Sequence, residues 1–241
     1  MNSICELLEW DTQFFGSRIA RLGRERLDGQ SLNGALDWCH QHKIECLYFL
    51  CAPDDNASVE LAEANGFHLA DIRIELNWKA QQSATHSPAS IRQANESDLV
   101  ELQRIAGQAF TNTRFSFDNR FAPKEAHKRV TDLYKIWVAG SCQSDDHTVF
   151  VAESGKTIAG FITCQFDDAR TGRIGLLALA ADAQGKGYGQ SLIQTAQQHF
   201  FLAGANEARV VTQGRNIAAQ RLYQSSGFRT CAVALWYHKW F

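Results

Sequence analysis

The chain has 241 residues, a formal net charge of −2 and 45% apolar residues, which fits one large or two small globular domains. The near-neutral charge gives no reason to expect nucleic acid as a partner. No apolar run is long enough to predict a membrane span, and residues 1–6 lack the basic and apolar regions of a secretory signal.

The seven cysteines are an odd number and include no Cys-x-x-Cys pair. They indicate neither a disulfide framework nor a zinc site, and the eight histidines show no metal-ligand spacing. We therefore expect a cytoplasmic protein that holds no metal ion.

The first 78 residues alternate between short strands and helices. The expected strands are 4–10, 18–22, 44–51 and 68–78, and the expected helices are 32–42 and 56–65. Gly66 is well placed to end the second helix. Residues 79–90 are polar, small and aperiodic, so they predict a linker between two domains.

Residues 91–241 form the second expected domain. Its expected strands are 91–94, 149–154, 157–166, 173–180, 208–212 and 231–240. Its expected helices are 99–109, 124–139, 191–203 and 216–226, and residues 111–123 are expected to be a loop rich in aromatic residues and arginine.

The two domains contain similar segments. Residues 56–67 resemble residues 216–228, and in each segment a leucine lies five residues before a Gly-Phe pair. The similarity is either a repeat or a chance likeness of two helix ends. If it is a repeat, the first copy has Ala62 where the second has Tyr223, which leaves the chemistry to the second copy.

The segment most informative about function is 181–190, with the sequence ADAQGKGYGQ, between an expected strand and an expected helix. This arrangement aims backbone N–H groups and a helix N-terminus at an anion. A Walker phosphate loop would need Ser or Thr after Gly-Lys, but Gly187 follows Lys186. A dinucleotide fingerprint would need a further glycine after Gly189 and a ribose-binding acid, and the chain places neither there.

A family resemblance rests on this loop together with residues downstream of it. The order of elements over residues 91–241 resembles the GNAT acetyltransferases, as do Gln184-x-x-Gly187-x-Gly189, Asn216, Tyr223 and Gly227-Phe228. The resemblance implies an α/β fold (an α+β mixed sheet), in which a GNAT domain at 91–241 follows a truncated GNAT-like domain at 1–78 that lacks the cofactor loop.

The resemblance implies acetyl-CoA as the acetyl donor and gives the donor site two parts. Backbone amides of the loop would hold the pyrophosphate, and backbone groups of the preceding strand would pair with the pantetheine arm. The loop residues are Gln184, Gly185, Lys186, Gly187, Tyr188, Gly189 and Gln190, and the strand residues are Leu177, Ala178 and Leu179. The amide of Leu177 or Ala178 could also stabilise an oxyanion. Arg229 either reaches the CoA phosphates or is solvated.

Tyr223 is the expected general acid, because a phenol of pKa about 10 can protonate a departing thiolate of pKa roughly 8.5. Asn216 lies seven residues earlier on the same helical face and is expected near the pantetheine. Without the loop, the two residues would be interpreted as a core tyrosine and a helix cap. No spacing identifies a general base, so Asp118, His127, a water relay and an amine that arrives neutral all remain open.

The acceptor is expected at residues 111–123. Together with residues 8–16 and 173–177, this region resembles those GNAT enzymes that acetylate the 4-amino group of a TDP-linked amino-dideoxy sugar. The resemblance implies a nucleotide-linked amino sugar as partner, with Arg114 and Arg120 on a diphosphate and Phe115, Phe117 or Phe121 beside a sugar or base. Alternatively, these aromatic residues pack beneath the loop and the arginines are solvated.

Three functional alternatives remain open. The enzyme could acetylate another small amine or a protein N-terminus, or the chain could be a non-catalytic acyl-CoA-binding module. The intact loop and Tyr223 disfavour the module. The aromatic final strand could also pack between the subunits of a homodimer.

Overall fold

A computed structural model describes residues 4–81, 90–111, 113–121 and 126–241, including all of their side chains except those of 126–129. Their backbone forms a ten-stranded mixed sheet in the order β1-β2-β3-β10-β4-β9-β8-β7-β6-β5. The predicted α/β class with a mixed sheet is thereby confirmed. Most of the expected linker, 82–89, lies outside the described residues.

The strands and helices follow the chain order anticipated from the sequence, with a few additions. The strands are β1 (Cys5–Leu7), β2 (Ile19–Leu22), β3 (Cys46–Cys51), β4 (His68–Lys79), β5 (Ser90–Gln93), β6 (His147–Ser154), β7 (Thr157–Asp168), β8 (Thr171–Leu179), β9 (Glu207–Gln213) and β10 (Arg229–Trp240). The helices are α1 (Glu9–Phe15), α2 (Gly29–Gln41), α3 (Asn56–Ala64), α4 (Leu99–Ala109), α5 (Arg114–Phe117), α6 (Ala126–Gln143), α7 (Tyr188–Leu202) and α8 (Ile217–Ser225), with 3-10 turns at η1 (Glu96–Asp98) and η2 (Ala181–Ala183).

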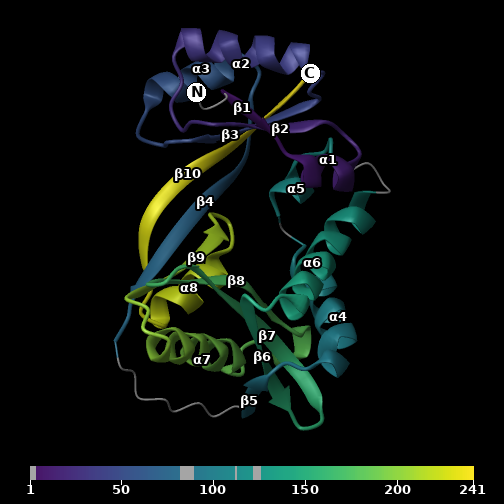
Figure 1. The fold of residues 1–241 in the computed structure, drawn as a ribbon, viewed down its shortest axis with the longest axis vertical. Coiled ribbons are helices and arrows are strands. Elements are labelled where there is room, and N and C mark those ends of the chain that lie inside the picture. The colour runs from purple at the N-terminus through teal and green to yellow at the C-terminus, as the bar shows by residue number, and fades with distance from the viewer. Residues whose placement is uncertain (1–3, 82–89, 112, 122–125) are drawn as a thin grey trace.

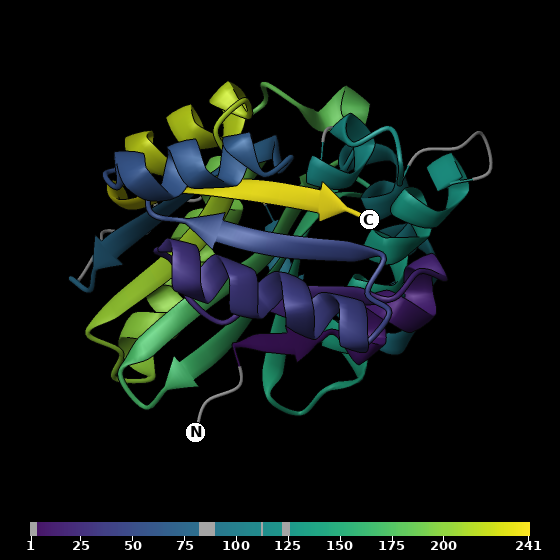
Figure 2. The same ribbon diagram turned by 90° about the horizontal axis from the view of Figure 1, so that it is seen from above.

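The two parts of the chain exchange strands. β4, from the first part, lies between β9 and β10, and β10, from the second part, lies between β3 and β4. Figure 1 shows these two long strands side by side, joining the two ends of the molecule. Figure 2 shows β3 and β10 running in opposite directions, in agreement with their antiparallel pairing. Residues far apart in sequence are thereby brought into one site.

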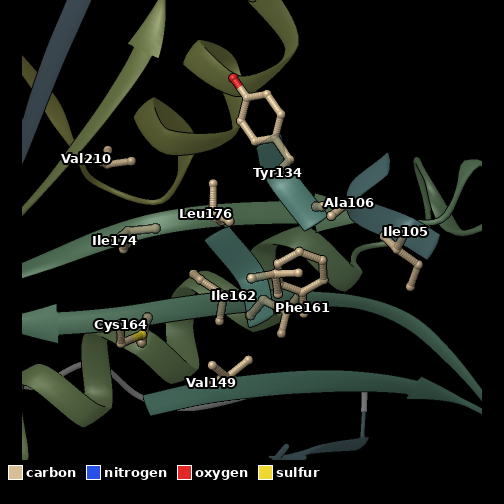
Figure 3. Close-up of a cluster of buried hydrophobic side chains, with 14 of the residues drawn as sticks. Ile105, Ala106, Tyr134, Val149, Phe161, Ile162, Cys164, Ile174, Leu176 and Val210 are labelled. Carbon is tan, nitrogen blue, oxygen red and sulfur yellow. The ribbon is translucent and has the colours of Figure 1, made fainter. Parts of the chain in front are cut away.

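The buried apolar residues form two clusters, and each cluster includes residues from both parts of the chain. The smaller cluster includes Leu32, Phe49 and Phe67 beneath α2 and α3. The larger lies around β6–β9, where α4 and α6 cover one face of the sheet and α7 and α8 the other (Figure 1). Figure 3 shows part of this cluster, with Phe161 and Ile162 of β7 near Leu176 of β8. This packing fixes the strands that border the site.

Two helices lie where the sequence predicted other structure. Residues 9–15 form α1 instead of the end of a strand and a loop. Glu9 and Asp11 stand in its first turn, where carboxylates are favourable, and Gly16 ends it at a φ of 72°. Trp10 and Phe14 lie one turn apart and stack on each other, but seven residues are too few for a helical period to be evident in the sequence. The short α5 lies within the expected loop 111–123.

Candidate active site

A cavity of about 890 Å³ lies where β8, β9, α5, α6, α7, α8, β4 and β10 meet. Most of the predicted site residues border it: Leu177, Ala178, Leu179, Gln184, Gly185, Gly187, Gly189, Gln190, Asn216, Tyr223, Arg114 and Phe115. The first part of the chain contributes Asp71 and Arg73. The residues expected to bind the donor and the acceptor therefore share one space.

The strand before the glycine loop separates from its neighbour at the cavity. β8 pairs in parallel with β9 only from Thr171 to Ile174. Farther on, β8 remains paired with β7 up to Leu179, but no described pairing joins it to β9. The edge of residues 175–179 that faces β9 therefore has backbone groups available to an extended ligand.

The glycine loop has an open, left-handed backbone. Gly185 and Gly187 have φ values of 72° and 87°, and a Cβ at either position would meet no atom within 4 Å. This conformation disfavours other residues because it costs an L-residue about 1–2 kcal/mol. A Cβ on Gly189 would lie 3.0 Å from Leu222 Cδ2, so this glycine allows α7 to pack closely against α8.

Helix α7 begins earlier than expected, at Tyr188, with Gly187 as its N-cap. The Ser191 N–H donates to the Gly187 carbonyl oxygen at 3.1 Å. The amides of residues 188–190 come before this bond and have no partner within the helix. They and the positive end of the helix dipole are available to an anion.

Tyr223 lies on α8 and is 5% exposed. Burial raises the pKa of its phenol well above the usual value, so the hydroxyl stays protonated at neutral pH. No described residue forms a hydrogen bond with this hydroxyl. Tyr223 is thus a buried residue that also borders the cavity, and its role as general acid stays a prediction.

Asn216 is the N-cap of α8, and its Oδ1 accepts a hydrogen bond from the Ala219 amide at 3.1 Å. It also borders the cavity. Its side-chain amide nitrogen has no hydrogen-bond partner among the described residues. The residue can therefore cap the helix with its oxygen while its nitrogen remains a donor for a ligand.

Asp71 is a residue of the cavity that the sequence did not reveal. It lies on β4, is only 3% exposed, and its Oδ1 accepts from the Ile72 amide at 2.8 Å. Burial raises the pKa of its carboxyl group, against the smaller opposing effects of that hydrogen bond and of Arg215, whose Nε lies 4.0 Å away. The expected strand 68–78 alternates apolar and charged residues, and nothing in that pattern distinguishes Asp71 from Arg73 or Glu75.

Arg114 is a cation in an aromatic box at the cavity. Its Cζ lies 4.1, 4.4 and 4.6 Å from the ring centroids of Trp236, Tyr48 and Phe115. Its Nη1 is buried without a hydrogen-bond partner, and no described carboxylate lies within 4.0 Å of it. A half-buried guanidinium that borders a cavity without a carboxylate partner is suited to an anionic group of a ligand.

The other residues expected to bind the acceptor lie elsewhere. Phe121 is 3% exposed and packs in the core instead of bordering the cavity. Phe117 is 49% exposed, and the Arg215 guanidinium lies 3.8 Å from its ring centroid. Arg120 is exposed and does not border the cavity, although its amide donates to Asp118 at 3.1 Å.

The remaining candidates also lie off the cavity wall. Lys186 and Arg229 are exposed and Tyr188 is half-buried, and none of the three borders the cavity. Asp118, one candidate base, is bonded to His238 and Trp240 away from it. The side chain of His127, the other candidate, lies outside the described residues.

Comparison with known proteins shows the class of protein to which the chain belongs. Residues 110–228 match the model of the acetyltransferase (GNAT) family. The chain therefore contains a GNAT acetyltransferase domain, and the predicted resemblance is confirmed. The protein is an enzyme of the N-acetyltransferase class.

Two named acetyltransferases are similar in sequence to this chain, and one of them aligns with it over nearly its whole length. The chain is 29% identical over 242 residues to the dTDP-fucosamine acetyltransferase of Escherichia coli O6:H1 (strain CFT073), and the alignment covers 97% of each protein. A mycothiol acetyltransferase of Beutenbergia cavernae is 36% identical over 66 residues, which are 27% of this chain and 22% of that protein.

Solved structures share the fold across the whole chain. A conserved protein of unknown function from Staphylococcus epidermidis has a TM-score of 0.69 at 14% identity, covering 99% of this chain and 92% of that one. A GCN5-related N-acetyltransferase from Sphaerobacter thermophilus has a TM-score of 0.66 at 14% identity, covering 98% and 76%. Because both likenesses extend over nearly the whole chain, they include the first part as well as the GNAT domain.

Among the described residues, no helix combines the length and the apolar character of a membrane span. Within the same residues, no group of three or more His, Cys, Asp or Glu side chains could hold a metal ion.

Proposed function

We propose that the protein uses acetyl-CoA to acetylate the amino group of a nucleotide-linked amino sugar, with the 4-amino group of a TDP-linked amino-dideoxy sugar as the acceptor. The observation that supports this most is the shared cavity: the free edge of β8, the N-terminus of α7, Tyr223, Asp71 and Arg114 all border it. This combination would supply a donor groove, an acid, a base and an anion contact within one space.

The donor half of the cavity fits acetyl-CoA in two respects. Amides of residues 188–190 and the open backbone at Gly185 and Gly187 would hold the pyrophosphate. The free edge of residues 177–179 would pair with the amide groups of pantetheine. Acetyl-CoA supplies an activated acetyl thioester to the site.

Asp71 and Tyr223 would handle the protons of the transfer. The acceptor amine attacks in its neutral form, and Asp71 takes one proton from its nitrogen as the new bond forms, directly or through a water. The new bond joins the amine nitrogen to the acetyl carbon as the carbon–sulfur bond breaks. Tyr223 gives its proton to the sulfur, and solvent restores the tyrosine while Asp71 releases its proton. Burial raises the pKa of each group, which makes Asp71 a stronger base. The raised pKa keeps Tyr223 protonated at neutral pH, although it also makes the phenol a weaker acid.

Arg114 would recognise the anionic part of the acceptor. It borders the cavity and has no carboxylate partner among the described residues, so its guanidinium can donate to a diphosphate oxygen. The similarity to the E. coli enzyme over 97% of both chains supports a nucleotide-linked amino sugar over a peptide. Arg120, which lies away from the cavity, is not part of this proposal.

The test is thiol release from acetyl-CoA across a panel of amines: TDP-linked 4-amino sugars, the same sugars without nucleotide, polyamines and peptides with free N-termini. We expect turnover with the nucleotide-linked sugars. Arg114→Gln should raise their KM about tenfold or more while changing the KM of any free amino sugar little. Turnover only with peptides or polyamines would contradict the proposed acceptor.

A further inference from the structure

The end of β10 holds a buried polar cluster that lies outside the cavity. His238 is fully buried, and its Nδ1 lies 2.7 Å from Asp118 Oδ2. Trp240 Nε1 donates to the same oxygen at 2.9 Å. Asp118 comes from the turn that follows α5, more than 100 residues earlier in the chain. We call these three residues the C-terminal anchor.

The imidazole of the C-terminal anchor is a neutral donor. Burial lowers the pKa of His238, and this effect exceeds the opposing one of Asp118. Burial alone would raise the pKa of Asp118, but hydrogen bonds from His238 and Trp240 outweigh it and keep the carboxyl group ionised. One carboxylate oxygen thus accepts two N–H donors of one strand, which is a strong charge-assisted arrangement.

The C-terminal anchor determines where Arg114 lies. Helix α5 has only four residues, too few to be stable without tertiary contacts. Its start is capped by the buried Thr113, whose Oγ1 accepts from the Ser116 amide, and its end is tied to β10 through Asp118. The third residue on the same face of β10 is Trp236, whose ring lies against the Arg114 guanidinium.

The aromatic packing around the C-terminal anchor links the same elements. The ring of Phe121, which follows Asp118 in the chain, lies 4.8 Å from that of Trp240 and 5.5 Å from that of His238. The ring of Tyr48 lies 4.7 Å from that of His238 and also contacts Arg114. A single strand face therefore fixes both the segment 113–121 and the box around its arginine.

We propose that Asp118, His238 and Trp240 are positioning residues that hold Arg114 in place for the acceptor. This inference rests on the proposed function, because it gives Arg114 an anion to bind. Without the C-terminal anchor, the order of residues 113–121 must be acquired during binding, which weakens acceptor affinity. The donor groove of α7 and β8 lies on other elements and is unaffected.

The experiment compares Asp118→Ala and Trp240→Phe with Tyr237→Phe. Trp240→Phe removes one donor and keeps an aromatic ring against Phe121. Tyr237 points to the opposite face of β10 and is 1% exposed. Its hydroxyl donates a hydrogen bond of 3.1 Å to Glu63 Oε1, and Tyr237→Phe removes only this bond. The control therefore removes one hydrogen bond from the same strand without touching residues 113–121.

Two measurements are made on each variant of the full chain. The first gives the KM of acetyl-CoA and the KM of the acceptor that wild type uses. The second is amide hydrogen exchange of residues 113–121 without substrates. We expect Asp118→Ala to raise the acceptor KM about tenfold and to speed exchange in this segment, with the acetyl-CoA KM within about twofold of wild type. Trp240→Phe should change both readouts less, and Tyr237→Phe should change neither.

Unchanged exchange and acceptor KM in Asp118→Ala would overturn the inference, and so would equal increases in both KM values. Absence of wild-type turnover with every nucleotide-linked sugar contradicts the proposed function instead. In that case the exchange measurement alone decides whether Asp118 positions the segment, because it requires no acceptor.

Discussion

Asp71 and Tyr223 come from different parts of the chain and border the same cavity. Asp71 lies on β4, which the first part inserts between β9 and β10, and Tyr223 lies on α8 of the GNAT domain. The strand exchange thus gives the GNAT domain a buried carboxylate that its own strand β8 lacks. Because each half supplies one of the two groups that would move protons, neither half is expected to be active alone.

Replacing Tyr223 with Phe should lower kcat by about ten- to a thousand-fold and leave the acetyl-CoA KM nearly unchanged, because only the proton donor is lost. Steady-state kinetics measure both constants. Tyr237→Phe is the matched control, since it also removes one buried phenol hydroxyl but lies away from the cavity. An unchanged kcat in Tyr223→Phe would exclude the general-acid role.

Asp71→Asn should lower kcat/KM by about a hundredfold, because the amide cannot accept the amine proton. Activity in wild type requires the ionised carboxylate, so it should fall as pH falls through the pKa of Asp71. Burial raises that pKa, so the midpoint should lie above the usual Asp value of about 3.9. The pH profile of kcat/KM tests this prediction. If Asp71→Asn still showed the same fall in kcat/KM at low pH, another group would be the one that must be ionised.

The same substitution should make the protein more stable at neutral pH. The folded-state pKa of Asp71 is raised, so its favourable contribution is present below the unfolded pKa and is lost as pH rises through the folded value. At pH 7 the buried charge therefore costs stability that an amide does not. Thermal unfolding should give a higher Tm for Asp71→Asn at pH 7 and converging values near pH 3. A lower Tm at pH 7 would mean that the hydrogen bond to Ile72 outweighs the burial of the charge.

Gly187→Ala tests the donor loop. A Cβ there has open space, but the φ of 87° strains any L-residue by about 1–2 kcal/mol. The loop should relax away from its anion-binding shape, raising the acetyl-CoA KM several-fold with little change in the acceptor KM. Gly29→Ala is the control, because Gly29 also has open space but an ordinary φ. Equal behaviour of the two variants would show that the left-handed turn is not needed for donor binding.

Much of the secondary structure in the second part of the chain could be predicted from the sequence, because the residue patterns that indicate it are local. The glycines at 185 and 187 mark left-handed positions, and Asn216 and Tyr223 stand two turns apart at one helix. Helices α1 and α5 were not predicted because seven and four residues are too few to show a helical period. Phe121 was considered for the acceptor, but its ring is buried against the C-terminal anchor.

The sequence by itself determined the class of fold and the form of the donor loop, since a glycine conformation and a helix start depend on neighbouring residues. Only the tertiary structure decided which carboxylate enters the cavity and which arginine is left with a free donor. Asp71 and Arg114 are placed by the pairing of β4 and β10 and by contacts with Tyr48 and Trp236. These pairings and contacts join residues more than 60 positions apart, so they cannot be predicted from the local pattern of residues along the sequence.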